Sequence, residues 1–193
     1  MTGLQRATPL KKVSRPNPKQ SMRWRVWATT AWLLACMAFL AVGETRAAAQ
    51  KNSPMHGHAP EFSRMDLAGK EIDLRAFRGK VVLLNFWATW CAPCQLELPR
   101  FAAWQSEYGS AGLQVIAVSM DDDASPVRAT AGKLQLNYPI VVGDEKLGTQ
   151  YGGILGLPVS FLIDRKGVVR ARLNGETDLR GLERRIKFLL KSR

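Results

Sequence analysis

The chain has 193 residues, of which 46% are hydrophobic and 23% are charged, and its formal net charge is +12. Eight basic residues and one acidic residue, Glu44, give residues 1–49 a net charge of +7, which leaves only +5 for the rest. The remaining ~140 residues suffice for one domain with its own core, and they contain no basic run interleaved with aromatics of the kind that binds nucleic acid.

The N-terminal part has the pattern of an export signal. Residues 1–25 carry seven basic and no acidic side chains, and an apolar stretch of 18 residues follows at 26–43. Small residues stand beyond it at Ala47 and Ala49. This order is typical of a signal peptide, so we expect cleavage after Ala49. An uncleaved membrane anchor is the alternative, because 18 apolar residues just reach membrane-spanning length.

Two details of this segment stay open. Cys36 could carry a lipid, although the residues after it remain apolar, and translation could begin at Met22 rather than Met1. Every option leaves the basic leader inside and places the following domain outside the cytoplasm, in the periplasm or at the inner membrane.

Residues 50–60 form a polar linker, so the folded domain is expected at 61–193. Met55, His56 and His58 could bind copper through thioether and imidazole groups. A solvated tail is the simpler interpretation. No other metal site and no cofactor is expected.

The domain opens with a predicted hairpin and a central strand. The segments 65–67 and 71–74 flank a turn at 68–70, as in a short hairpin. The run Val81–Trp87 is almost continuously apolar, which suits a strand that is covered on both faces.

Two cysteines follow this strand at the start of an amphipathic helix that should end at Tyr108 and kink at Pro99. The first turn of a helix has unpaired N–H groups and a positive dipole end, so it favours a thiolate. Cys91 and Cys94 are close enough to close and reopen a disulfide, which predicts thiol–disulfide exchange. The alternatives are a static disulfide or a zinc site, but zinc needs about four ligands and no second pair exists.

The Trp-Cys-x-x-Cys motif at residues 90–94, after a buried strand, resembles the thioredoxin superfamily. Glu97 and Pro99 extend the resemblance to its TlpA/ResA-like branch of extracytoplasmic thiol–disulfide oxidoreductases, over roughly residues 59–190. The resemblance implies an α/β thioredoxin-like fold: a central mixed sheet flanked by helices, an N-terminal hairpin, and a helix and strand inserted between the Cys-x-x-Cys helix and a cis-proline.

The later elements are predicted in the same order. Asp121–Asp123 should form a solvated turn at a strand end, and Ser125 should cap the next helix with Pro126 at its first position. The expected elements are a strand at 113–120, a helix at 125–134, a strand at 138–142, a short helix at 147–151, an edge-side strand before 164, a strand at 168–173 and a helix from 179.

By the resemblance, the Leu157–Pro158 bond is cis and lies against the cysteine pair, where it helps to hold the partner's extended chain. Trp90 and Pro93 are expected to form an apolar rim around the thiol, or simply to pack.

The resemblance also implies the roles of the site residues. An exposed Cys91 attacks the partner's disulfide, and Cys94 then displaces the partner. Glu97 is assigned to proton handling, because Asn85 stands where thioredoxin has an aspartate and cannot usefully accept a proton.

The implied partners are extracytoplasmic clients with thiols or disulfides and a membrane thiol–disulfide protein that donates electrons, with cytochrome c maturation or copper-site assembly as candidate processes. A peroxiredoxin is excluded, because its Pro-x-x-x-Thr-x-x-Cys pattern would need other residues than Leu84 and Ala88. The alternative function is a copper chaperone that uses the cysteine pair with Met55, His56 and His58.

Overall fold

The computed structural model describes residues 57–192. The leader, the apolar stretch with Cys36, and the linker residues Met55 and His56 lie outside the described residues. Within residues 57–192, no helix combines the length and the apolar character that crossing a membrane requires.

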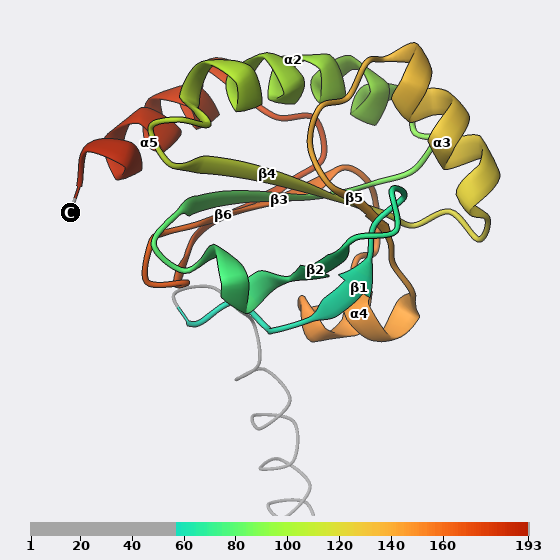
Figure 1. Ribbon diagram of the computed structural model, residues 1–193, viewed down its shortest axis with the longest axis horizontal. Helices are drawn as coiled ribbons and strands as arrows, with labels where there is room; N and C mark the ends of the chain where they lie inside the picture. The colour runs from blue at the N-terminus through green and yellow to red at the C-terminus, as the bar shows by residue number, and fades with distance from the viewer. Residues whose placement is uncertain (1–56, 193) are drawn as a thin grey trace, which may run out of the picture. The chain divides into compact units, whose positions relative to one another are not determined.

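The elements include a two-stranded hairpin, a five-stranded sheet and four α-helices over the described range (Figure 1). In chain order they are β1 (Ser63–Met65), β2 (Glu71–Asp73), the 3-10 helix η2 (Leu74–Phe77), β3 (Val81–Trp87), α2 (Ala92–Tyr108), β4 (Leu113–Ser119), α3 (Ala124–Lys133), β5 (Ile140–Val142), α4 (Glu145–Gln150), β6 (Val159–Ile163), β7 (Val169–Asn174) and α5 (Leu179–Lys191).

The central strand β3 is buried along its whole length. The sheet order is β5-β4-β3-β6-β7, in which β3 pairs parallel with β4 and antiparallel with β6. Successive side chains of a strand point to opposite faces, so Leu83 and Trp87 enter one apolar cluster and Leu84 and Phe86 the other. This double burial explains the continuous apolar run in the sequence.

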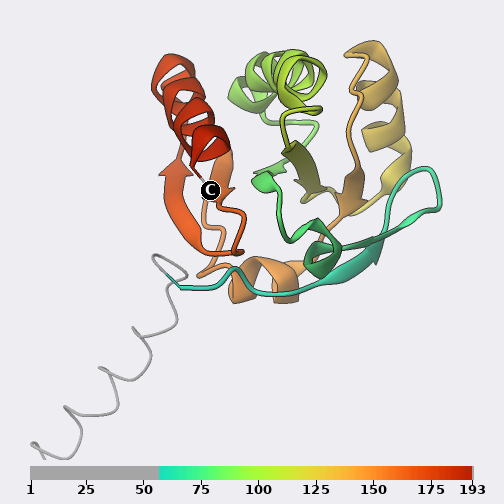
Figure 2. The ribbon, with the colours of Figure 1, turned by 60° about the vertical axis from the view of Figure 1, so that its left-hand side comes forward.

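Helices α2, α3 and α5 cover one face of the sheet, and α4 with the β1–β2 hairpin covers the other (Figures 1 and 2). Helix α2 itself contributes the large side chains of Leu98, Phe101 and Trp104, each fully buried. The predicted mixed sheet flanked by helices is therefore confirmed, and so is the inserted helix and strand, which are α3 and β5.

Two expectations need correction. Strand β6 is not at the sheet edge, because β7 pairs along its outer side. The end of the expected linker already belongs to the domain: the Ala59 N–H donates to Gly167 O and the Val169 N–H to Gly57 O, both at 2.9 Å. His58 forms a β-bridge with Val168 in the same place.

The cap of α3 also differs from the prediction. The N-cap is Asp123 and the first helical residue is Ala124, each two residues earlier than the expected Ser125 cap and Pro126 start. The Asp123 carboxylate accepts the Ser125 N–H at 2.9 Å, so the aspartate takes the role that the sequence assigned to the Ser125 hydroxyl. Either residue type is a good cap, and only the backbone path decides between them.

We predict that Asp123→Ala lowers the free energy of unfolding by about 1 kcal/mol, because a free helix N–H loses its acceptor. Ser125→Ala is the matched control and should have a smaller effect. Urea unfolding of both variants measures the difference, and a larger loss for Ser125→Ala would show that the serine is the cap after all.

Candidate active site

The cysteine pair lies where β3 passes into α2. After β3 ends at Trp87, a short loop turns the chain, and the Cys91 N–H donates to Ala88 O at 3.1 Å. Cys91 is the N-cap of α2 and is joined to Cys94 by a disulfide. The Cys94 N–H donates to the Cys91 sulfur at 3.3 Å. The sulfur thus occupies the position that a capping oxygen usually takes, at the positive end of the helix.

Cys91 is less exposed than the sequence suggested. In the disulfide form its exposed fraction is 5%, and that of Cys94 is 1%. Both cysteines belong to the apolar cluster beneath α2. Cys91 remains the more accessible of the two sulfur-bearing residues.

Asp121 holds the loop before the cysteines. Its carboxylate accepts the Thr89 N–H at 2.9 Å, the Thr89 hydroxyl at 2.6 Å and the Ser119 hydroxyl at 2.7 Å. The Gln95 side-chain amide donates to Thr89 O at 2.5 Å from the other side. Both backbone polar groups of Thr89 are therefore fixed, which restricts the positions of Trp90 and Cys91.

The expected solvated turn at Asp121 is wrong, since this residue is only 8% exposed. The reason is the strand register. Trp87 lies opposite Ser119 in the parallel pair β3–β4, so the residues that follow the two strands leave the sheet side by side. The sequence signal that could have identified the role of Asp121 was its position just after β4, the strand that runs parallel to β3 and ends beside it.

Glu97 is buried one helical turn after Cys94, with an exposed fraction of 2%. Its Oε1 accepts the Thr177 N–H at 2.6 Å, and its Oε2 has no hydrogen-bond partner among the described residues. Burial raises the pKa of the Glu97 carboxyl above its ordinary value, and hydrogen bonding by the Thr177 N–H counteracts this only in part. Residues three apart lie on the same side of a helix, so Glu97 and Cys94 share a face.

Asn85 is fully buried on β3, and its amide donates to the Ser160 hydroxyl of β6 at 3.0 Å. Since strand side chains alternate, it faces α2 together with Leu83 and Trp87. With a neutral amide at this position, the buried carboxyl group on this side of the sheet is that of Glu97 on α2.

The residues expected to form the rim are placed as follows. Trp90 is 72% exposed and Pro93 is also exposed, so neither is a packing residue. The Leu157–Pro158 bond is cis, as the resemblance implied. Leu157 packs against the cluster that contains both cysteines. Leu96, one of the larger apolar residues of the amphipathic helix, is 76% exposed on α2 and adds to the apolar surface near the helix start.

The structure separates His58 from the cysteines. His58 forms a β-bridge with Val168. The next residue, Val169, pairs with Ile163, which in turn pairs with Val82 near the beginning of β3. His58 therefore lies near the beginning of β3, whereas the cysteines follow its end. Trp87 stands five residues after Val82 along β3, which corresponds to about 17 Å. A copper site that combines Cys91, Cys94 and His58 is therefore not formed. No group of three or more potential metal ligands occurs within residues 57–192.

Comparisons with known proteins agree with this geometry. Residues 55–172 match the model of the AhpC/TSA family. The chain is 38% identical over 131 residues to the thiol-disulfide oxidoreductase ResA of Bacillus thuringiensis subsp. konkukian, covering 67% of this chain and 75% of the relative. It is 38% identical over 115 residues to the thioredoxin-like protein YneN of Bacillus subtilis, covering 58% and 66%.

Among solved structures, a thiol:disulfide interchange protein of the thioredoxin family from Chlorobium tepidum superposes with a TM-score of 0.65 at 29% identity. The match covers 69% of this chain and 95% of that one.

We predict that Asp121→Ala lowers the free energy of unfolding by about 2 kcal/mol, because it leaves three donors without an acceptor. Asp122→Ala, at the exposed neighbour, is the control and should change stability by less than about 0.5 kcal/mol. Urea unfolding of the oxidised protein measures both. Equal small effects would mean that Asp121 does not hold the loop.

Glu97 predicts a specific dependence of stability on pH. A carboxyl whose pKa is raised by folding keeps its proton in the folded state after the unfolded chain has lost it. Its contribution to stability is therefore complete below the ordinary value of 4.5 and falls as the pH rises through the folded pKa.

Glu97→Gln should remove this fall, so the stability difference between variant and parent should shift in favour of the variant as the pH rises above 4.5. Glu107→Gln, at an exposed position of the same helix, is the control. Unfolding curves across the pH range, with the disulfide intact, test this. A difference that stays constant with pH would contradict a raised pKa.

Proposed function

The chain belongs to the AhpC/TSA family and is a thioredoxin-like thiol–disulfide oxidoreductase, and we propose that it reduces disulfides of client proteins outside the cytoplasm through Cys91 and Cys94. The observation that carries this proposal is the cap of α2, where the Cys94 N–H points at the Cys91 sulfur at 3.3 Å. This donor and the helix dipole stabilise a thiolate on Cys91 once the pair is reduced.

The reaction consists of two exchanges. The Cys91 thiolate attacks one sulfur of the client disulfide and forms a mixed disulfide, and the other client sulfur leaves as a thiolate. The Cys94 thiolate then attacks the Cys91 sulfur, which releases the second client thiolate and closes the Cys91–Cys94 disulfide. The client gains two electrons and the protein loses two.

Glu97 is the group we assign to the proton of Cys94. The thiol of Cys94 is buried, and burial opposes formation of its thiolate. The Glu97 carboxylate, one turn along the helix, is the proton acceptor, and its raised pKa brings its proton affinity closer to that of a thiol. The free Oε2 leaves one carboxylate oxygen available for this proton.

The client chain is proposed to lie across the apolar rim around the cysteines. Trp90 and Pro93 offer exposed apolar surface, and we propose that the cis Leu157–Pro158 segment forms the other side of this rim. The Pro158 carbonyl already accepts the Gly175 N–H at 2.8 Å. This hydrogen bond holds the conformation of the segment in the absence of a client.

The direction of electron flow determines the partners. Each turnover as a reductase leaves the cysteine pair oxidised, so an electron donor must reduce it again. We propose a membrane thiol–disulfide protein as this donor, in keeping with the export signal or anchor expected before residue 50. Clients would be exported proteins whose cysteine pairs must be reduced before they bind haem or copper, as in cytochrome c maturation or copper-site assembly.

We predict that Cys94→Ser accumulates mixed disulfides with client proteins, because the attack that resolves them is missing. Cys91→Ser should neither trap clients nor reduce insulin. Non-reducing electrophoresis and mass spectrometry of the trapped species measure the outcome and identify the clients. Trapping by Cys91→Ser but not by Cys94→Ser would reverse the two roles, and full insulin reduction by both variants would refute the reaction.

A further inference from the structure

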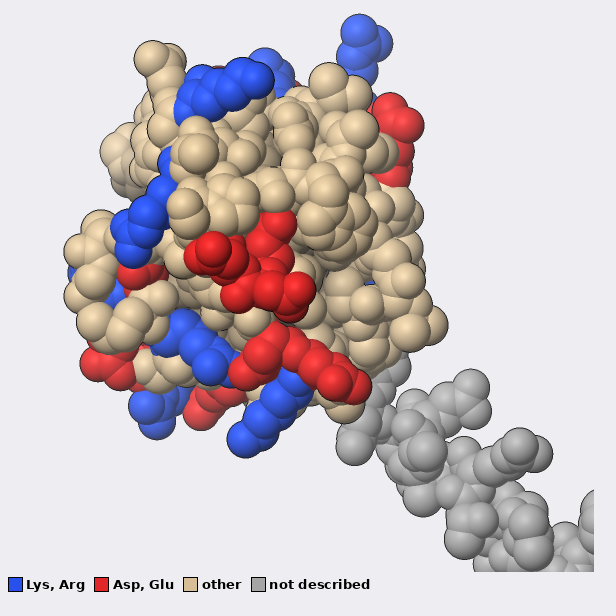
Figure 3. Space-filling view, turned by 90° about the vertical axis from the view of Figure 1, so that its right-hand side faces the viewer, with Lys and Arg blue, Asp and Glu red and all other residues tan. Residues whose placement is uncertain are grey.

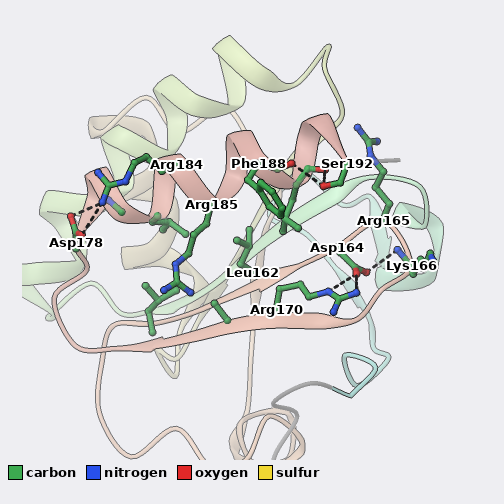
Figure 4. Close-up of a pocket in the computed structure, with 15 residues that line it drawn as sticks. Leu162, Asp164, Arg165, Lys166, Arg170, Asp178, Arg184, Arg185, Phe188 and Ser192 are labelled. Carbon is green, nitrogen blue, oxygen red and sulfur yellow. Dashed lines mark hydrogen bonds and ion pairs between the residues drawn. The ribbon is translucent and has the colours of Figure 1, made fainter.

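A groove of about 740 Å³ lies between α5 and the β6–β7 hairpin (Figure 4). It contains neither cysteine and none of the residues assigned above to catalysis or client binding. The hairpin turn at Asp164, Arg165 and Lys166 forms one end of the groove, and Asp178, the N-cap of α5, forms the other.

The two sides of α5 have different neighbours. On one side Glu183 accepts the Tyr108 hydroxyl at 2.8 Å and pairs with Arg100 at 3.0 Å, which attaches the helix to α2. The other side, with Gly181, Arg185 and Phe188 at spacings of four and three residues, faces the groove. Residues at this spacing lie along one stripe of a helix, so the stripe that lines the groove has no covering element among the described residues.

The walls of the groove are basic. Five cations and two carboxylates line it. Of the two carboxylates, that of Asp164 forms an ion pair with the Arg170 guanidinium at 2.6 Å. Asp178 is 4.0 Å from Arg184, and both side chains are more than 70% exposed, so this ion pair contributes little.

Three of the five cations form no ion pair within residues 57–192, and one of these, Arg165, instead donates to the carbonyls of Gly79, Ala111 and Leu190. Lys166 and Arg185 form no ion pair with any side chain of residues 57–192, and they stand on opposite walls, in the hairpin turn and on α5. Figure 4 shows Arg185 extending from α5 toward the hairpin.

The groove also offers apolar contact. Leu173 and Leu189 are partly buried in it, and Phe188 is 71% exposed at its edge. Few large aromatic side chains within residues 57–192 are this exposed. Exposed apolar surface bordered by polar residues is typical of interaction sites.

We infer that this groove binds a segment of a partner protein that presents apolar side chains flanked by carboxylates. Cations on both walls of a concave surface fit an acidic chain that lies between them, whereas a flat membrane surface reaches only protruding groups. The 13 residues of α5 give the groove a length of about 20 Å, which matches an amphipathic helix of similar length lying in the groove.

The opposite charge occurs elsewhere on the molecule. Figure 3 shows acidic side chains gathered in the middle of the face that forms the right-hand side of Figure 1. The free end of α5 lies on the left-hand side of Figure 1. This separation of charge would orient an acidic partner toward the groove and away from that face.

The test uses a fluorescein-labelled synthetic peptide, an amphipathic helix of leucine and glutamate, with the oxidised protein. A second peptide replaces every glutamate by lysine. Fluorescence anisotropy should show saturable binding of the acidic peptide only, and binding should weaken as the salt concentration rises. The double variant Lys166→Glu and Arg185→Glu should weaken binding about tenfold, equivalent to ~1.4 kcal/mol, and Phe188→Ser should weaken it as well.

Arg180→Glu is the matched control. Arg180 is an exposed cation of α5 that does not line the groove, so its reversal should leave binding nearly unchanged. Insulin reduction should be the same for all these variants, which separates this inference from the proposed redox function.

Three results would overturn the inference: no binding of the acidic peptide, an equal loss for Arg180→Glu, or binding only to vesicles of phosphatidylcholine with phosphatidylglycerol. The last would identify a membrane surface in place of a protein partner.

Discussion

The contact between the Cys94 N–H and the Cys91 sulfur is the interaction on which the rest of the site depends. It exists because β3, buried on both faces, delivers the chain to the N-terminus of α2 at a fixed place. The helix begins immediately after Cys91, so the free N–H groups of its first turn point toward the sulfur. The apolar core thus serves the chemistry by holding a strand end and a helix start together.

Two buried carboxylates near the cysteines have different surroundings, and this difference suggests different tasks. Asp121 accepts hydrogen bonds from three donors on both oxygens, which suits a side chain that holds the loop at Thr89. Glu97 has one donor, the Thr177 N–H, and one oxygen with none. A carboxylate that is poorly satisfied takes up a proton more readily, so Glu97 suits proton transfer and Asp121 suits positioning.

The sequence predicted what depends on local pattern. The apolar run Val81–Trp87 marked the central strand, and the two cysteines at a helix start marked the site. It did not predict contacts that depend on how distant segments meet. Thr177, which holds Glu97, lies 80 residues along the chain, and Asp121 is buried only because β4 pairs in register with β3.

The near-complete burial of Cys91 could not be predicted either, because it depends on how distant segments pack into the cluster that contains both cysteines. Spacing indicated that the two cysteines could meet, but not how far inward the bond would lie.

The central claim is that Cys91 is the stabilised thiolate and Cys94 the buried resolving thiol. The most direct measurement is alkylation of the reduced protein with iodoacetamide across a range of pH, with mass spectrometry to identify the modified cysteine. The account predicts that Cys91 reacts first and titrates below the ordinary thiol pKa of about 8.5. Faster modification of Cys94, or a Cys91 that titrates at or above the ordinary value, would contradict it.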